Sequence, residues 1–162
     1  QGAATNTTKS KTQCENLAEI AGRTASRVAA GMPSADPSAQ AAIFAVSLGA
    51  EAAGITNPLA VFGIFGRASN VVPGDQGGYA DELGGNNTGQ ARHFAATVYS
   101  VAQVGSFVAE RVWRRRERGE PDDWALSQKG IQLMRDLSSG SVRMSGRAVQ
   151  DWTLTNLCKD KQ

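Results

Sequence analysis

Histidine and cysteine are scarce in this chain, which has one histidine and two cysteines among its 162 residues. These are too few to build an ordinary zinc site. The acidic residues Asp75, Asp81 and Glu82 lack the spacing of a calcium-binding loop, and the glycines around them match no phosphate-binding motif. We therefore expect neither a metal ion nor a cofactor. The formal net charge of +2 is also too small to indicate a nucleic-acid partner.

Patterns typical of β-structure are absent as well. No alternating run of convincing length predicts a strand, and the sequence contains no internal repeat. Apolar residues recur instead at helical spacing, and 41% of the residues are hydrophobic, which is ordinary for a globular domain. We predict an all-α fold, a single-domain bundle of five to six helices.

Prolines, glycines and N-cap residues indicate where the helices begin and end. The pattern predicts helices over residues 12–30, 37–54, 59–65, 88–118, 121–140 and 146–158. We expect residues 1–11 to form a flexible segment, 12–158 the domain and 159–162 a tail. The apolar stretch 41–65 is not expected to cross a membrane, because Glu51 and the break at 54–58 interrupt it.

The two cysteines, Cys14 and Cys158, stand near opposite ends of the chain. The simplest interpretation is one disulfide that ties the first helix to the last and closes the bundle. The alternative is two unrelated buried thiols, since a free cysteine packs like a small hydrophobe. A disulfide persists only in an oxidising compartment, and the chain opens with Gln1, as it would after removal of a signal peptide. We therefore expect an extracytoplasmic protein, whether secreted, periplasmic or on the cell surface.

Residues 67–87 form a glycine-rich segment without helical or strand periodicity. A loop of this length is uncommon in a compact domain and is often functional. Its side chains Asp75, Tyr79 and Asp81 are therefore candidate binding residues. The segment is equally well explained as a solvated connection between two halves of a bundle.

The only histidine, His93, follows Arg92 in the first turns of the predicted helix 88–118. Backbone N–H groups at a helix start favour anions, so Arg92 is a candidate anion-binding residue. The same field favours a neutral His93 that could act as a base. Glu51 is the only charge in an otherwise apolar helix and could be the acid of a catalytic pair with His93. The alternatives are a half-buried, inert histidine and a solvent-facing glutamate.

Gly105 lies at the middle of an apolar seam along the predicted helix 88–118. Glycine within a helix costs about 1 kcal/mol relative to alanine, so we expect a compensating close crossing by another helix at this point. Ala102 and Ala109 would keep the same groove shallow. Replacement of Gly105 by leucine should then overpack the crossing.

Residues 113–118 combine a tryptophan with four arginines. Such a segment could contact phosphates, or its positive charge could simply complement the C-terminus of the helix. Nearby carboxylates, at Glu117, Glu120, Asp122 and Asp123, are expected to neutralise it. We therefore do not expect nucleic-acid binding.

The run Ala91-Arg92-His93-Phe94, followed by Gly105 and by Ala109-Glu110, resembles a pattern in uncharacterised secreted bacterial helical domains. Some of those domains are C-terminal modules of toxin-like chains, and an Arg-His pair opens their long helix. The likeness covers about residues 87–110, and this chain lacks the later His-Glu pair of the pattern. It implies an extracytoplasmic helical domain and supplies no activity.

Two functions are compatible with these observations. The first is a non-enzymatic helical component that acts through protein–protein or cell-envelope contacts, because apolar helix faces left exposed could bury against a partner or a second copy. The second is a small secreted hydrolase or toxin-like effector that uses His93 and Glu51 as base and acid, with Arg92 holding an anion and the glycine-rich loop acting as a lid. The ligand of either is left open, and the position of His93 relative to Glu51 distinguishes them.

Overall fold

The computed structural model describes residues 10–57 and 68–160, which form a bundle of α-helices without a β-strand among them. Helical elements include 69% of the described residues, so the predicted all-α fold is confirmed. The predicted helix 59–65 and most of the predicted flexible segment 1–11 lie outside the described residues. The elements in chain order are α1 (Gln13–Gly31), α2 (Pro37–Ala53), η2 (a 3₁₀ turn, Asp81–Leu83), α3 (Gln90–Arg116), α4 (Pro121–Ser139) and α5 (Gly146–Leu157).

The helices α1, α2 and α5 begin at capping residues that the sequence makes visible. Thr12 and Glu15 form a capping box at the start of α1, in which each side chain accepts a hydrogen bond from the backbone N–H of the other. Asp36 and Ser145 cap α2 and α5 more simply, each with a side-chain oxygen that accepts a hydrogen bond from a backbone N–H in the first turn. Such caps satisfy N–H groups that lack a partner inside the helix. The observed ends of all five described α-helices lie within two residues of the predicted ones.

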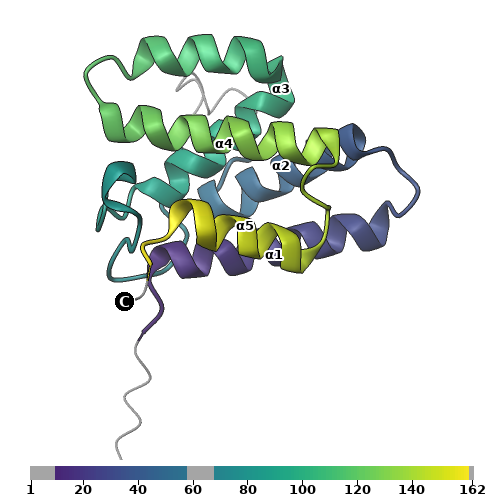
Figure 1. Cartoon of the computed structure of the whole chain (residues 1–162), viewed down its shortest axis with the longest axis horizontal. Coiled ribbons are helices and arrows are strands. Elements are labelled where there is room, and N and C mark those ends of the chain that lie inside the picture. Colours follow the sequence, from purple (N-terminus) through teal and green to yellow (C-terminus); the bar gives the residue numbers. More distant parts are fainter. Residues whose placement is uncertain (1–9, 58–67, 161–162) are drawn as a thin grey trace, which may run out of the picture.

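The helices pack closely where one of them carries glycine. Figure 1 shows α1 running beside α5 at one side of the molecule, with α4 and α3 stacked beyond them. A Cβ atom built on Gly22 of α1 would lie 2.9 Å from the carbonyl oxygen of Gly146 in α5. One built on Gly49 of α2 would lie 2.7 Å from the ring of Tyr99 in α3. Both contacts are too short for alanine, so these glycines set the distance between helices.

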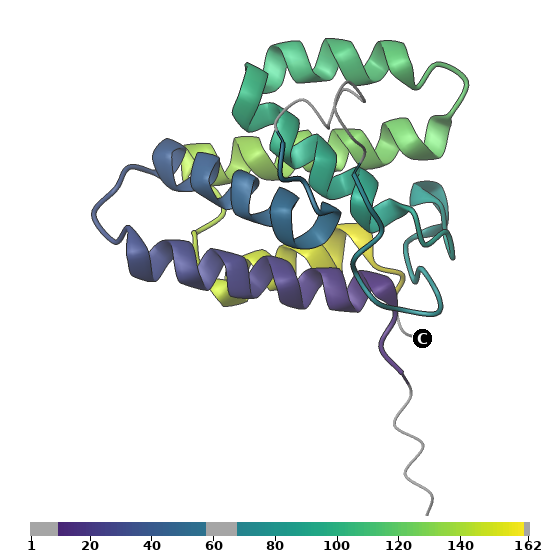
Figure 2. The same cartoon turned by 180° about the vertical axis from the view of Figure 1, so that it is seen from behind.

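The long helix α3 changes direction sharply at Gly105, where φ is 83° and ψ is 162°. Figures 1 and 2 show a proximal segment (90–104) rising through the bundle and a distal segment (106–116) that runs back along α4. A Cβ atom on Gly105 would meet no atom within 4 Å. The predicted helix crossing at Gly105 is therefore wrong, because this glycine serves a turn that other residues rarely adopt.

The first and last helices are joined at one end of the molecule. Cys14 and Cys158 form a disulfide with their Cα atoms 5.6 Å apart, which confirms the predicted pairing. The glycine-rich loop wraps this end: the Cys14 N–H donates to the Gly77 carbonyl, and the Lys159 N–H donates to the Gly78 carbonyl, both at 2.9 Å. The loop is thus fastened to both terminal helices and belongs to the structural framework.

None of the described helices combines the length and the apolar character that crossing a bilayer would require. The described part of the apolar stretch 41–65 belongs mainly to α2, which ends at Gly54 in a left-handed conformation (φ 62°, ψ 27°).

Candidate functional site

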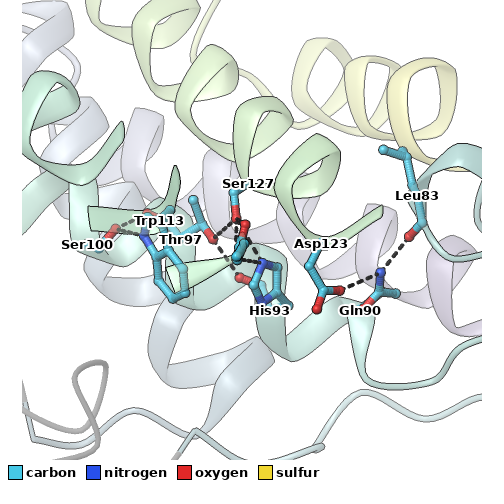
Figure 3. Close-up of polar contacts among 9 residues, drawn as sticks. Leu83, Gln90, His93, Thr97, Ser100, Trp113, Asp123 and Ser127 are labelled. Atoms are coloured by element: carbon cyan, nitrogen blue, oxygen red, sulfur yellow. Dashed lines mark hydrogen bonds and ion pairs between the residues drawn. The ribbon is translucent and has the colours of Figure 1, made fainter. Parts of the chain in front are cut away.

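The only histidine lies in a polar cluster between α3 and α4. Its Nε2 atom is 2.8 Å from the Ser127 hydroxyl and 2.7 Å from a Glu117 carboxylate oxygen. The Ser127 hydroxyl is also within 2.9 Å of both carboxylate oxygens of Glu117. Ser127 is fully buried, Glu117 is 5% exposed, and the histidine side chain is 18% exposed. We call His93, Glu117 and Ser127 the His93 cluster; Figure 3 shows its histidine and serine side by side.

The geometry of the His93 cluster differs from that of a catalytic triad. In a serine hydrolase one ring nitrogen of the histidine faces the serine and the other faces the carboxylate. Here Nε2 alone faces both Ser127 and Glu117. If Glu117 is ionised, it can only accept hydrogen bonds, and the arrangement that satisfies it places a proton on Nε2 and directs the Ser127 proton to Glu117. Nε2 is then not free to remove a proton from Ser127.

The distal segment of α3 closes over the cluster through Trp113. The indole ring meets the His93 ring edge-on, with the ring centroids 5.2 Å apart. Its Nε1–H donates to the Ser100 hydroxyl at 2.8 Å, so that the distal segment is bonded back onto the proximal one (Figure 3). In an uninterrupted helix, Glu117 would stand about 36 Å along the axis from His93. The reversal at Gly105 is therefore what creates the cluster.

Sequence reasoning missed the two partners of His93. It treated Glu117 as a surface charge that neutralises nearby arginines, whereas the structure buries this side chain against His93. It assigned no role to Ser127. No local pattern links these three positions, because their proximity depends on a turn inside what the sequence presents as one helix.

The candidate binding residues Arg92, Asp75, Tyr79 and Asp81 lie in different environments. Arg92, Asp75 and Asp81 are exposed, and Asp81 forms an ion pair with Lys159 at 3.3 Å. Tyr79 is fully buried, in contrast to the loop ligand expected from the sequence, because its ring fills the core beside the disulfide. Burial raises the pKa of the Tyr79 phenol above its ordinary value.

A second buried residue that the sequence did not single out, Gln13, fastens the loop to the bundle. Its amide oxygen accepts a hydrogen bond from the Tyr79 hydroxyl at 2.8 Å. Its amide nitrogen donates to the carbonyls of Thr88, at 2.6 Å, and Val72, at 3.3 Å. One side chain at the start of α1 thus holds both ends of the loop, and such an anchored loop is poorly suited to act as a lid.

Glu51, the proposed acid, lies elsewhere. Its carboxylate forms an ion pair with Arg27 and accepts a hydrogen bond from the Thr24 hydroxyl at 2.6 Å. It lines a groove between α1 and α2 with a volume of about 490 Å³, and His93 is not among the residues that line this groove. The structure therefore does not bring the two proposed catalytic residues together. Glu51 contacts side chains of α1, through an ion pair and a hydrogen bond, and His93 contacts the Ser127 hydroxyl of α4.

Within residues 10–57 and 68–160, no group of three or more histidine, cysteine, aspartate or glutamate side chains is arranged to hold a metal ion. Comparison with known proteins adds no family assignment. No protein-family model matches the chain, and no match was found among curated proteins or solved structures.

Proposed function

We propose that this chain is an extracytoplasmic helical domain that acts by binding, through protein–protein or cell-envelope contacts, and not by catalysis. The observation that carries the proposal is the environment of the only histidine, His93. Its Nε2 atom lies within hydrogen-bonding distance of Ser127 and Glu117, both of which are buried inside the fold. A general base must reach a substrate proton directly or through one water. Nε2, which faces both the buried Ser127 hydroxyl and the buried Glu117 carboxylate, is poorly placed to do so.

Exposed apolar side chains support a binding role. A monomeric protein carries scattered apolar surface residues, but a contiguous set marks a contact surface. Three of those exposed here lie within five residues of one another on either side of the Gly105 turn. The large hydrophobic side chains that are exposed among the described residues are Ile43, Val46, Val71, Val104, Phe107, Val108 and Leu154.

The alternative function, a hydrolase that uses His93 and Glu51, has weaker support. The two side chains bind different partners on different helices. The Ser127 hydroxyl, the nearest nucleophile type to His93 in the cluster, is fully buried. An acid/base pair would need both groups to face one substrate.

The disulfide supports the extracytoplasmic part of the proposal, since such bonds are rare in a reducing cytosol. Its position adds to this support. It joins the two terminal helices at the point where the loop is also fastened, so it serves the framework of the fold and is not isolated on the surface.

The proposal is tested by co-sedimentation of the oxidised protein with purified bacterial cell envelopes that contain membrane, wall and their proteins. We expect saturable binding to envelopes and no hydrolysis of generic ester, peptide or glycoside substrates. A protein that stays in the supernatant at every envelope concentration, and that remains a monomer in sedimentation velocity, would refute the binding function. Hydrolysis that disappears in the His93→Gln variant would favour the alternative.

A further inference from the structure

The distal segment of α3 has two faces of opposite character. Its inner face is buried through Ala109 and Trp113, and Glu117 continues that side into the His93 cluster. On the opposite side, Phe107 is 70% exposed and Val108 is 44% exposed. Arg111 and Arg115 follow four and eight residues after Phe107, or close to one and two helical turns, so they lie on the same outward face. Figure 1 shows the segment along one edge of the molecule.

The outward face is apolar at one end and basic at the other. Phe107 and Val108 stand in its first turn, and Val104, the last residue before the Gly105 turn, is 36% exposed. The guanidinium of Arg111 lies over the Phe107 ring, 5.4 Å from its centroid. This contact places a positive charge directly against an exposed aromatic side chain.

The carboxylates closest in sequence to the arginines of this face are engaged elsewhere in the structure. Glu117 points into the bundle, and Glu110 is paired with Arg114 and Arg135 at 3.0 and 3.1 Å. Within the described residues, no carboxylate pairs with Arg111 or Arg115. The exposed carboxylates that follow, Glu120 and Asp122, come after the turn that leads into α4. The outward face therefore carries a net positive charge, although the whole chain is nearly neutral.

We propose that this outward face binds the surface of an anionic lipid bilayer. The inference rests on the proposed function, because it names the component of the envelope that is bound. A bilayer interface offers both things that the face requires: phosphate groups for Arg111 and Arg115, and an acyl boundary for Phe107, Val104 and Val108. Guanidinium groups suit phosphate because they donate two parallel hydrogen bonds.

A nucleic acid fits the same face less well. It would supply phosphates for the arginines and bases for the single aromatic ring. It has no aliphatic phase in which Val104 and Val108 could be buried. A bilayer interface offers an apolar boundary beside its phosphate groups, so it can accommodate both the apolar end and the basic end of this face.

The experiment is co-sedimentation of the oxidised protein with protein-free vesicles, made either of phosphatidylcholine alone or of phosphatidylcholine with phosphatidylglycerol. We expect binding to the anionic vesicles and little to the neutral ones, with the affinity falling as salt is raised. Each arginine near an anionic surface contributes about fivefold to the partition coefficient. The double variant Arg111→Ala, Arg115→Ala should therefore bind roughly 30-fold more weakly. Phe107→Ser should bind about tenfold more weakly.

Matched controls remove the same groups elsewhere. The double variant Arg143→Ala, Arg147→Ala takes two exposed arginines from the other end of the chain, and Leu154→Ser takes an exposed apolar side chain from α5. Both should bind as wild type does. Because all these positions are surface exposed, each variant should keep its circular dichroism spectrum.

Three results would overturn the inference. The wild type could fail to bind anionic vesicles, or the α3 variants could bind as tightly as the controls. The wild type could also bind duplex or single-stranded DNA more tightly than vesicles, with no effect of Phe107→Ser, which would make the face a nucleic-acid surface. Binding to whole envelopes without binding to vesicles would refute this inference and leave the proposed function standing.

Discussion

The reversal of α3 at Gly105 leads to a prediction about stability. The direction in which Gly105→Ala changes the free energy of unfolding distinguishes a continuous helix from a helix that turns at Gly105. If residues 90–116 were one continuous helix, Gly105→Ala would stabilise the protein by about 1 kcal/mol, because alanine is the better helix former. In the observed structure Gly105 has φ 83° and ψ 162°, a region that is almost restricted to glycine. A residue with a Cβ atom there costs on the order of 1–3 kcal/mol. We therefore expect Gly105→Ala to be destabilising by this amount.

Comparison with leucine identifies the cause of the loss. A Cβ atom at Gly105 meets no atom within 4 Å, so the cost arises from the backbone and not from crowding. Gly105→Leu should then be about as destabilising as Gly105→Ala. A helix crossing at this position would instead make leucine much worse than alanine. Gly31→Ala is the matched control, because Gly31 has open space around it and no positive φ; it should be neutral or slightly stabilising.

The assay is urea unfolding followed by circular dichroism, with the free energies compared at equal m-values. The tryptophan fluorescence of the protein should also change in Gly105→Ala if the strained turn loosens, since the ring of Trp113, one of its three tryptophans, packs on His93. A Gly105→Ala variant that is as stable as wild type, or more stable, would refute the reasoning. The distal segment would then continue the proximal one, and Glu117 could not reach His93.

Three further predictions concern the end of the molecule where the terminal helices meet. Reduction of the disulfide, which closes a loop with a sequence separation of 144, should cost about 5 kcal/mol by the chain-entropy estimate and lower Tm by roughly 10–20 °C in calorimetry. Gln13→Ala leaves the buried Tyr79 hydroxyl without its acceptor and should cost about 2–4 kcal/mol in urea unfolding, whereas the exposed Gln132→Ala should change stability by less than about 0.5 kcal/mol. Burial raises the pKa of Tyr79 above the ordinary value of 10.0. The buried neutral phenol therefore contributes its full share to the free energy of unfolding below pH 10, and this share is lost progressively as the pH rises above 10. The pH dependence of unfolding in that alkaline range should therefore be shallower for Tyr79→Phe, by about 1.4 kcal/mol per pH unit.

The parts of the fold that could be predicted are those governed by local chemistry. Thr12, Asp36 and Ser145 cap helices where their side chains reach the first free N–H groups, and these residues can be found in the sequence alone. The pairing of Cys14 with Cys158 could also be predicted, because the chain has no other cysteine.

The site depended on geometry that the sequence does not encode locally. Apolar residues continue at helical spacing on both sides of Gly105, so the periodicity is the same for one straight helix and for two helices joined by a turn. Only the φ of Gly105 distinguishes them, and that angle decides whether Glu117 meets His93 or stands on the surface. The burial of Tyr79 could not be predicted for a related reason. Its hydroxyl bonds to Gln13, which lies 66 residues away in the sequence, so no local pattern indicates the contact.

The disulfide also determines how the domain would respond to tension. Cys14 and Cys158 lie near the two ends of the part of the chain that the structure describes, with their Cα atoms 5.6 Å apart, so a force that pulls on both sides of this part passes through the sulfur–sulfur bond. The helices between the two cysteines bear none of it. If the bond were reduced, the same force would act on the helices and could extend this stretch to about 500 Å. The domain is therefore a mechanical link that is short while oxidised and extensible once reduced.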